Sequence, residues 1–275
     1  MANASPSPQT FSGSIAQLYE QYLVPLIFEP YAIDLARRIM ALQPSAVLEI
    51  AAGTGVVTRK LAAQLPAQTP IIATDLSQPM LDHAQSIGTT RPVNWQQADA
   101  MRLPFDDGSF DVVVCQFGAM FFPDKAVAFT EARRVLRPGG TFLFNVWDRL
   151  EDNVFAECVT QAMAELFPAD PPRFLARLPH GYFDDAVIAD ALLRGGFVGP
   201  IAFDTVTVQS VADSARTVAV AYCQGTPLRN EIEARDATIL PRATDMAAEA
   251  LQQRFGTGAI TGKIQARVIT ATRED

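Results

Sequence analysis

Cysteine and basic residues are both scarce in this sequence of 275 residues. The three cysteines, Cys115, Cys158 and Cys223, are odd in number and form no C-x-x-C pair. This argues against a disulfide scaffold and against a zinc site. Only 22 Lys and Arg stand against 30 Asp and Glu, which gives a net charge of −8. Because nucleic-acid binding needs a basic surface, no nucleic-acid partner is expected.

Long apolar runs are also missing from the sequence. None approaches the roughly 20 residues that cross a bilayer, so no membrane span is expected. Residues 1–10 are polar and rich in Pro and Ser, without the charged-then-apolar order of a signal peptide. A cytoplasmic location is therefore expected. The composition, 49% hydrophobic and 19% charged, is that of a globular chain that can bury a sizeable core.

The sequence does contain a strand, a tight turn and a helix start over residues 47–58. An apolar run ends in Glu49, and Gly53 and Gly55 follow. Glycine lets the backbone bend sharply and approach a ligand closely. In an open α/β sheet, this turn at the carboxyl end of the first strand is where a nucleotide-like ligand binds.

Two classes of ligand compete for this turn. A dinucleotide site has the pattern G-x-G-x-x-G and places a pyrophosphate at the helix N-terminus. Here Thr58 takes the place of the third glycine, and Glu49 precedes the turn. A carboxylate would repel a pyrophosphate but not a ligand that carries an ammonium or sulfonium group. An NAD(P) oxidoreductase is therefore the disfavoured alternative.

Residues 47–55 resemble motif I of the class I S-adenosylmethionine (SAM)-dependent methyltransferases, usually E-x-G-x-G-x-G, with Ala51 at the first glycine. Later segments resemble the same family in order, up to the L-x-P-G-G turn at residues 136–140. The resemblance implies a set of cofactor-binding residues. They are Glu49, Ala51, Gly53, Thr54, Gly55, Asp75, Leu76, Met80, Asp99, Ala100, Gln116 and Phe117.

The resemblance also implies a role for several of these side chains. Asp75 would hold the ribose hydroxyls, and Asp99 would accept a hydrogen bond from the adenine amino group. The segment that begins at Gln116 would face the methionine part of SAM. Two aromatic residues of the N-terminal region, Tyr19 and Tyr22, either close over SAM or simply pack.

The acceptor side is less well defined by the sequence. His180 lies in an insertion after the fifth strand, which covers the acceptor pocket in related small-molecule methyltransferases. A neutral imidazole there would take a proton from an acceptor hydroxyl; the alternative is a loop histidine without a catalytic role. Phe121, Tyr182 and Asp184 are the expected substrate-pocket residues, and no metal site is expected.

The predicted fold class is α/β, with a Rossmann-like, seven-stranded, mostly parallel sheet and helices on both faces. N-terminal helices and an inserted cap region are added to it. The expected division is a flexible N-terminus over 1–12, a helical segment over 13–43, the SAM-binding core over 44–148, a helix and loop cap over 149–199, and strands and helices over 200–275 that complete the sheet.

Patterns within these segments predict several individual elements. Pro25 and Pro30 should interrupt the first helix. Residues 167–185 are rich in Pro and read as a loop, and residues 245–255 read as a helix. The last strand, over 262–272, should run antiparallel beside the fifth, as it does in the family.

The sequence as a whole predicts a SAM-dependent methyltransferase that acts on an unidentified small-molecule acceptor. Oxygen is preferred over nitrogen or carbon as the acceptor atom, and S-adenosylhomocysteine (SAH) is the product. The alternative is a non-catalytic protein that binds SAM or SAH without an acceptor pocket. Whether the chain forms a homodimer stays open.

Overall fold

The computed structural model describes residues 13–275, and the chain divides into two compact units. The first unit gathers the residues up to Ile27 with 150–178 and 208–264, and the second gathers 28–149, 179–207 and 265–275. The flexible N-terminus expected over 1–12 lies outside the described residues. The expected division into consecutive segments stays a prediction.

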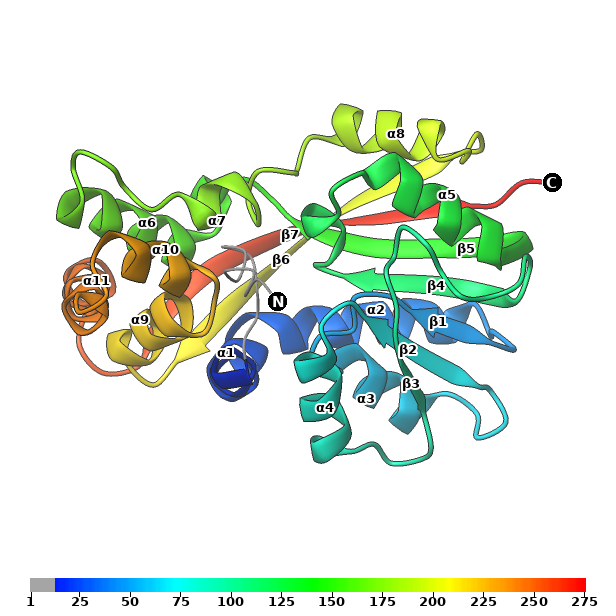
Figure 1. The fold of residues 1–275 in the computed structure, drawn as a ribbon, viewed down its shortest axis with the longest axis horizontal. Coiled ribbons are helices and arrows are strands. Elements are labelled where there is room, and N and C mark those ends of the chain that lie inside the picture. Colours follow the sequence, from blue (N-terminus) through cyan, green and yellow to red (C-terminus); the bar gives the residue numbers. More distant parts are fainter. Residues whose placement is uncertain (1–12) are drawn as a thin grey trace, which may run out of the picture. The chain divides into compact units, whose positions relative to one another are not determined.

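Within residues 13–275, the strands form one seven-stranded sheet in the order β3-β2-β1-β4-β5-β7-β6 (Figure 1). Strands β1 to β5 run parallel to one another, and β7 runs antiparallel to β5. The predicted fold class and the antiparallel last strand are thus confirmed. The strands are β1 (Val47–Glu49), β2 (Ile71–Asp75), β3 (Asn94–Gln97), β4 (Phe110–Gln116), β5 (Leu136–Trp147), β6 (Ile201–Ala212) and β7 (Ile260–Thr272).

Helices cover both faces of the sheet in the second unit. Figure 1 shows α5 and α8 above strands β4 and β5, and α2 and α3 below them. Because neither face is left to solvent, every residue of β1 and the centre of β4 are buried. The helices of this unit are α2 (Glu29–Ala41), α3 (Val56–Gln64), α4 (Gln78–Ile87), the 3₁₀ turn η2 (Ala119–Phe121), α5 (Lys125–Val135) and α8 (Asp185–Arg194).

The first unit is mainly helical, with parts of β6 and β7 added. Arg254 forms an ion pair with Glu157 at 2.7 Å, which joins α11 to α6. None of the helices between residues 13 and 275 combines the length and the apolar character needed to span a bilayer. The helices are α1 (Gly13–Leu18), the π-helix η1 (Tyr19–Phe28, which ends in the second unit), the 3₁₀ turn η3 (Leu150–Asp152), α6 (Val154–Leu166), α7 (Phe174–Arg177), α9 (Ala215–Gln224), α10 (Leu228–Arg235) and α11 (Leu240–Phe255).

Several differences between the predicted and observed helices involve proline. Pro25 and Pro30 were predicted to interrupt the first helix. Pro25 instead lies inside the π-helix η1, and Pro30 lies in the first turn of α2, where its missing N–H costs nothing. Pro241 occupies the first turn of α11 in the same way, so this helix begins five residues before the predicted start at 245. The predicted loop over 167–185 was partly wrong, since the short helix α7 forms within it.

Candidate functional site

The turn between β1 and α3 bends through three residues with left-handed backbone. Ala51 has a φ of 53°, Gly53 of 57° and Gly55 of 80°. A Cβ on Gly55 would lie 2.6 Å from the Trp95 ring, whereas no atom of the described chain lies within 4 Å of a Cβ built on Gly53. Gly55 is therefore required by packing, and the space above Gly53 is open to a ligand.

Asp75 joins the end of β2 to this turn. Its Oδ2 accepts a hydrogen bond from the Gly53 amide and its Oδ1 accepts one from the Ser77 amide, both at 2.8 Å. Burial raises the pKa of the Asp75 carboxyl, and the two amides oppose that shift. The structure thus fixes a carboxylate beside the open side of the glycine turn. The ribose contact expected of this residue stays a prediction.

Glu49 lies beneath the turn, with only 1% of its surface exposed. The Thr58 hydroxyl donates to its Oε2 at 2.5 Å. Burial raises the pKa of the Glu49 carboxyl to about 8. The threonine that replaces a glycine in the dinucleotide pattern therefore has a partner here, a role that its position in the sequence did not reveal.

The predicted adenine-side residues follow β2 and β3. Leu76 is 67% exposed and Met80 is buried on α4. Asp99 is half-buried, and its Oδ1 accepts from the Met101 amide at 2.9 Å, which orients the carboxylate. Ala100, the next residue, is half-buried as well. Asp75 is the last residue of β2, and Leu76 and Asp99 lie just after the carboxyl ends of the neighbouring parallel strands β2 and β3.

The segment after β4 is held by a polar residue of β5. Phe117 has a φ of 51°, and its amide donates to the Asn145 Oδ1 at 2.9 Å. The Phe117 ring stacks on Trp147 at 3.9 Å between centroids, and Tyr31 meets both rings edge-on. Sequence reasoning missed Asn145, although a polar residue in an otherwise apolar strand was the available signal.

Two buried polar atoms near the turn have no hydrogen-bond partner within the described part of the chain: Thr54 Oγ1 and Gln116 Oε1. Gln116 ends β4, directly beside β1, and Thr54 lies in the turn that follows β1. A buried polar atom without a partner costs about 1–3 kcal/mol, so such atoms point to a polar ligand. Both residues were predicted to contact the cofactor.

His180 is 6% exposed and lies in the loop between α7 and α8, beside the residue that follows β5. Its Nδ1 is 2.8 Å from the carbonyl oxygen of Asp148, and its ring centre is 6.0 Å from that of Trp147. Because a carbonyl only accepts, the Nδ1 carries the proton, and the Nε2 of the neutral ring is the basic nitrogen. The structure therefore gives the candidate base a defined tautomer.

The predicted substrate-pocket residues differ in their surroundings. Tyr182 is buried under the Lys125 ammonium, 4.7 Å from the ring centre, and Phe121 is half-buried in η2. Asp184 is the N-cap of α8, where its Oδ1 accepts from the Ala186 and Val187 amides. The remaining predicted contacts, Tyr19 and Tyr22, lie in η1 and belong to the other compact unit. Their roles, and those of the pocket residues, stay predictions.

Comparison with known proteins points to one family. A model described as "Methyltransferase domain" matches residues 48–144. The chain is 45% identical over 97 residues to a demethylmenaquinone methyltransferase of Lactiplantibacillus plantarum, which covers 34% of this chain and 41% of that protein. It is 39% identical over 123 residues to a ubiquinone/menaquinone biosynthesis C-methyltransferase, UbiE, of Idiomarina loihiensis, which covers 42% of this chain and 47% of that protein. The chain thus spans about half the length of these curated relatives.

The similarity in fold extends over nearly the whole chain. The structure of a SAM-dependent methyltransferase of Thermotoga maritima superposes with a TM-score of 0.54, at 16% identity, and covers 95% of this chain and 98% of that one. At this identity the comparison shows the fold alone.

Proposed function

Because residues 48–144 belong to the class I SAM-dependent methyltransferase family, we propose that the protein transfers the methyl group of SAM, by in-line displacement, to a small-molecule acceptor. The observation that carries this proposal is the glycine turn with the Asp75 carboxylate bound to the Gly53 amide. The turn leaves open space for a ligand at Gly53, and the Asp75 carboxylate offers hydrogen-bond acceptors for the two ribose hydroxyls of SAM.

The residues around the turn fit this cofactor. SAM carries an α-amino group and a carboxylate, and Thr54 Oγ1 and Gln116 Oε1 are buried polar atoms that lack a partner within residues 13–275. Asp75 would take the ribose hydroxyls, and Asp99 the adenine amino group. A cationic ligand would favour the ionised form of the buried Glu49 carboxyl, whereas an anionic pyrophosphate would disfavour it, which counts against the NAD(P) alternative.

When bound, SAM supplies an activated methyl group on a sulfonium. The protein then needs only to bind and orient the cofactor and the acceptor and to accept the proton that the acceptor loses. The ring of Phe117, which follows β4, stacks on that of Trp147, the last residue of β5. The Trp147 ring lies next to the His180 ring. We propose that the Nε2 of His180 accepts a proton from an acceptor hydroxyl. Tyr182, Phe121 and Asp184 remain the proposed pocket residues.

The acceptor atom is the finer part of the proposal. A base that takes the proton of an acceptor hydroxyl assists methyl transfer to that oxygen, which is the acceptor atom predicted from the sequence. The same base assists methyl transfer to the neighbouring carbon of an aromatic ring or enol. The named activity of the UbiE relative, a C-methyltransferase of quinone biosynthesis, favours the carbon as the second candidate. A cytoplasmic location, a homodimer and the absence of a nucleic-acid partner stay predictions.

Calorimetric titration with SAM, SAH and NADH tests the cofactor first. We expect micromolar binding of SAM and SAH and none of NADH. Asp75→Ala should weaken SAH binding at least tenfold, because it removes a charged hydrogen-bond acceptor of the ribose. His180→Ala should keep the affinity for SAH but lower turnover in a screen of phenolic and quinol acceptors by 10²-fold or more.

Asp82→Ala is the matched control, since Asp82 is an exposed carboxylate that accepts a hydrogen bond from Gln78 on the same helix. It should bind SAH as the wild type does. Absence of SAM binding to the wild type would remove the enzyme assignment. Binding without turnover on any acceptor would favour a non-catalytic SAM-binding protein, and unchanged turnover in His180→Ala would exclude this histidine as the base.

A further inference from the structure

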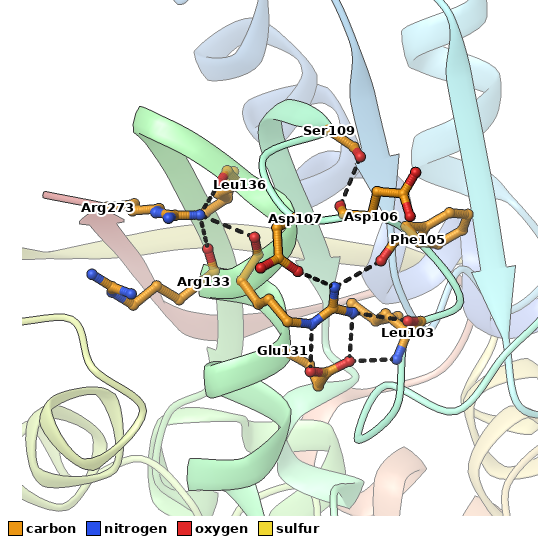
Figure 2. Close-up of polar contacts among 10 residues, drawn as sticks. Leu103, Phe105, Asp106, Asp107, Ser109, Glu131, Arg133, Leu136 and Arg273 are labelled. Carbon is orange, nitrogen blue, oxygen red and sulfur yellow. Dashed lines mark hydrogen bonds and ion pairs between the residues drawn. The ribbon is translucent and has the colours of Figure 1, made fainter. Parts of the chain in front are cut away.

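Arg134, in the last turn of α5, uses all five of its N–H donors (Figure 2). Two go to Glu131, one turn earlier: Nε to Oε1 at 2.8 Å and Nη2 to Oε2 at 2.9 Å. A third goes from Nη1 to the Asp107 Oδ1 at 2.7 Å. We call Glu131 and Arg134 together the α5 clamp.

The clamp holds the main chain of the segment before β4. Arg134 donates to the carbonyl oxygens of Leu103, at 2.9 Å, and Phe105, at 2.7 Å. The Glu131 Oε2 accepts from the Leu103 amide at 2.8 Å. Both polar groups of the Leu103 backbone are therefore bound by the same pair of side chains, and the buried Leu103 side chain adds a third point of attachment.

Leu103 is also one end of the turn that carries Asp99. The Arg102 amide donates to the Asp99 carbonyl oxygen at 2.9 Å, and the Met101 amide donates to the Asp99 carboxylate. At the other end, the Ala98 amide donates to the Asp75 carbonyl oxygen at 3.0 Å. The turn over 98–103 is thus fixed on one side by the end of β2 and on the other by the α5 clamp.

Burial, charge and side-chain shape all favour a fixed geometry of the α5 clamp. The side chains of Arg134 and Glu131 are 29% and 17% exposed, so the pair is partly shielded from solvent. Hydrogen bonds from Arg134 lower the pKa of Glu131, which keeps the carboxylate ionised at neutral pH. Lysine has three donors on a flexible stem and cannot reproduce a planar fork that serves five acceptors.

We propose that the α5 clamp is a positioning device for adenine recognition: it fixes the Leu103 end of the turn so that the Asp99 carboxylate accepts a hydrogen bond from a 6-aminopurine. This inference rests on the proposed function, because it assigns specificity within the same cofactor site. Glu131 and Arg134 touch no ligand themselves. They act through Leu103 and the turn, and their contribution is selectivity for the base.

The test compares SAH with S-inosylhomocysteine, whose purine has a carbonyl oxygen in place of the 6-amino group and carries a proton on N1. We expect the wild type to prefer SAH at least tenfold, since the carbonyl would face a carboxylate. In Glu131→Gln and Arg134→Lys this preference should fall at least fivefold, mainly through weaker binding of SAH. Thermal unfolding, followed by circular dichroism, checks that each variant is folded.

Arg137→Lys is the matched control. Arg137 lies close to the same helix end, where it forms an ion pair with Asp111 at 2.8 Å and donates a hydrogen bond to the carbonyl oxygen of Ser109. It should keep the wild-type preference. If the α5 clamp supported only the general fold, its variants would bind both ligands more weakly by the same factor, and the ratio of the two affinities would not change.

The outcomes separate the two proposals. A wild-type preference that persists in both clamp variants overturns the positioning role, as does SAH binding without any preference in the wild type; the proposed function survives in either case. If the wild type binds neither ligand, both proposals fall. Should Arg134→Lys not fold, Glu131→Gln alone decides, because it removes the charge and one of the two carboxylate oxygens that hold Leu103 and Arg134.

Discussion

At the scale of single residues, the site depends on side chains whose environment differs from what their type suggests. Glu49 was expected to act as a fixed negative charge before the turn. In the structure, burial raises its pKa to about 8, so the carboxyl is largely protonated at neutral pH in the ligand-free chain. A cationic ligand nearby would favour its ionised form, which links the binding of such a ligand to the release of a proton.

This shift predicts a pH dependence of stability. The unfolded chain loses the Glu49 proton near its ordinary pKa of 4.5, whereas the folded chain keeps it up to about pH 8. Stability from this group is therefore present below pH 4.5 and is lost as the pH rises through 8, at about 1.4 kcal/mol per unit of pKa difference. In Glu49→Gln, the free energy of unfolding in urea should fall less between pH 5 and pH 9 than in the wild type.

Glu151→Gln, which changes an exposed carboxyl, is the control and should follow the wild-type profile. Equal slopes for Glu49→Gln and the wild type would show that Glu49 titrates normally in the folded chain.

Residues that act through distant partners were the part of the site that the sequence could not predict. The family motifs placed Asp75 and Asp99 correctly at the carboxyl ends of β2 and β3, since each follows a recognisable strand. Thr58 was noted only as a departure from a glycine pattern, and its bond to Glu49 appears only once α3 packs on β1. Asn145 and the α5 clamp bind chain segments 28 residues away, which no local pattern reveals.

At the scale of elements, the family resemblance predicted the antiparallel last strand correctly, and the helices that contain proline were the main source of error. The predicted start of α11, at residue 245, was five residues too late, because Pro241 fits the first turn of this helix. In the α8 helix, Asp184 marks the start and Gly195 marks the end. Asp184 therefore caps this helix, which its place in the sequence did not reveal, and the pocket role expected of it stays a prediction.

Substitution of Asp184 separates these two roles. Asp184→Ala should lower the free energy of unfolding by about 1 kcal/mol, because the amides of Ala186 and Val187 lose their acceptor. Asp184→Asn should restore most of that loss, since asparagine is also a good N-cap. Asp190→Ala, which breaks an exposed ion pair with Arg194 on the same helix, is the control and should change stability by less than about 0.5 kcal/mol.

If Asp184→Asn is stable but loses turnover, the carboxylate also serves the acceptor. If Asp184→Ala is as stable as the wild type, the cap contributes nothing measurable and the interpretation of this contact is wrong.

At the scale of the whole molecule, the proposed cofactor contacts from Glu49 to Phe117 fall within one compact unit, and Tyr19 and Tyr22 belong to the other. A ligand that binds only the folded chain must stabilise it by mass action. At a SAH concentration of 100 times its Kd, this stabilisation is about 2.7 kcal/mol. For a chain of this size we expect the midpoint of thermal unfolding to rise by roughly 5–10 °C.

Differential scanning calorimetry with increasing SAH measures this shift, and Asp75→Ala should need about tenfold more SAH for the same rise. A midpoint that does not depend on SAH would contradict both the cofactor site and the role of Asp75. Tyr19→Ala and Tyr22→Ala should reduce the shift only if these side chains close over the ligand.

The chain passes between its two compact units five times, after residues 27, 149, 178, 207 and 264. No single cut can therefore release either unit as one continuous piece. The segments 150–178 and 208–264 are each joined at both ends to chain that belongs to the second unit. The motifs around Gly53, Asp75 and Asp99 lie in that second unit, as do the proposed pocket residues Phe121, Tyr182 and Asp184. A change of length within 150–178 or 208–264 would therefore leave the residues of the proposed site in place.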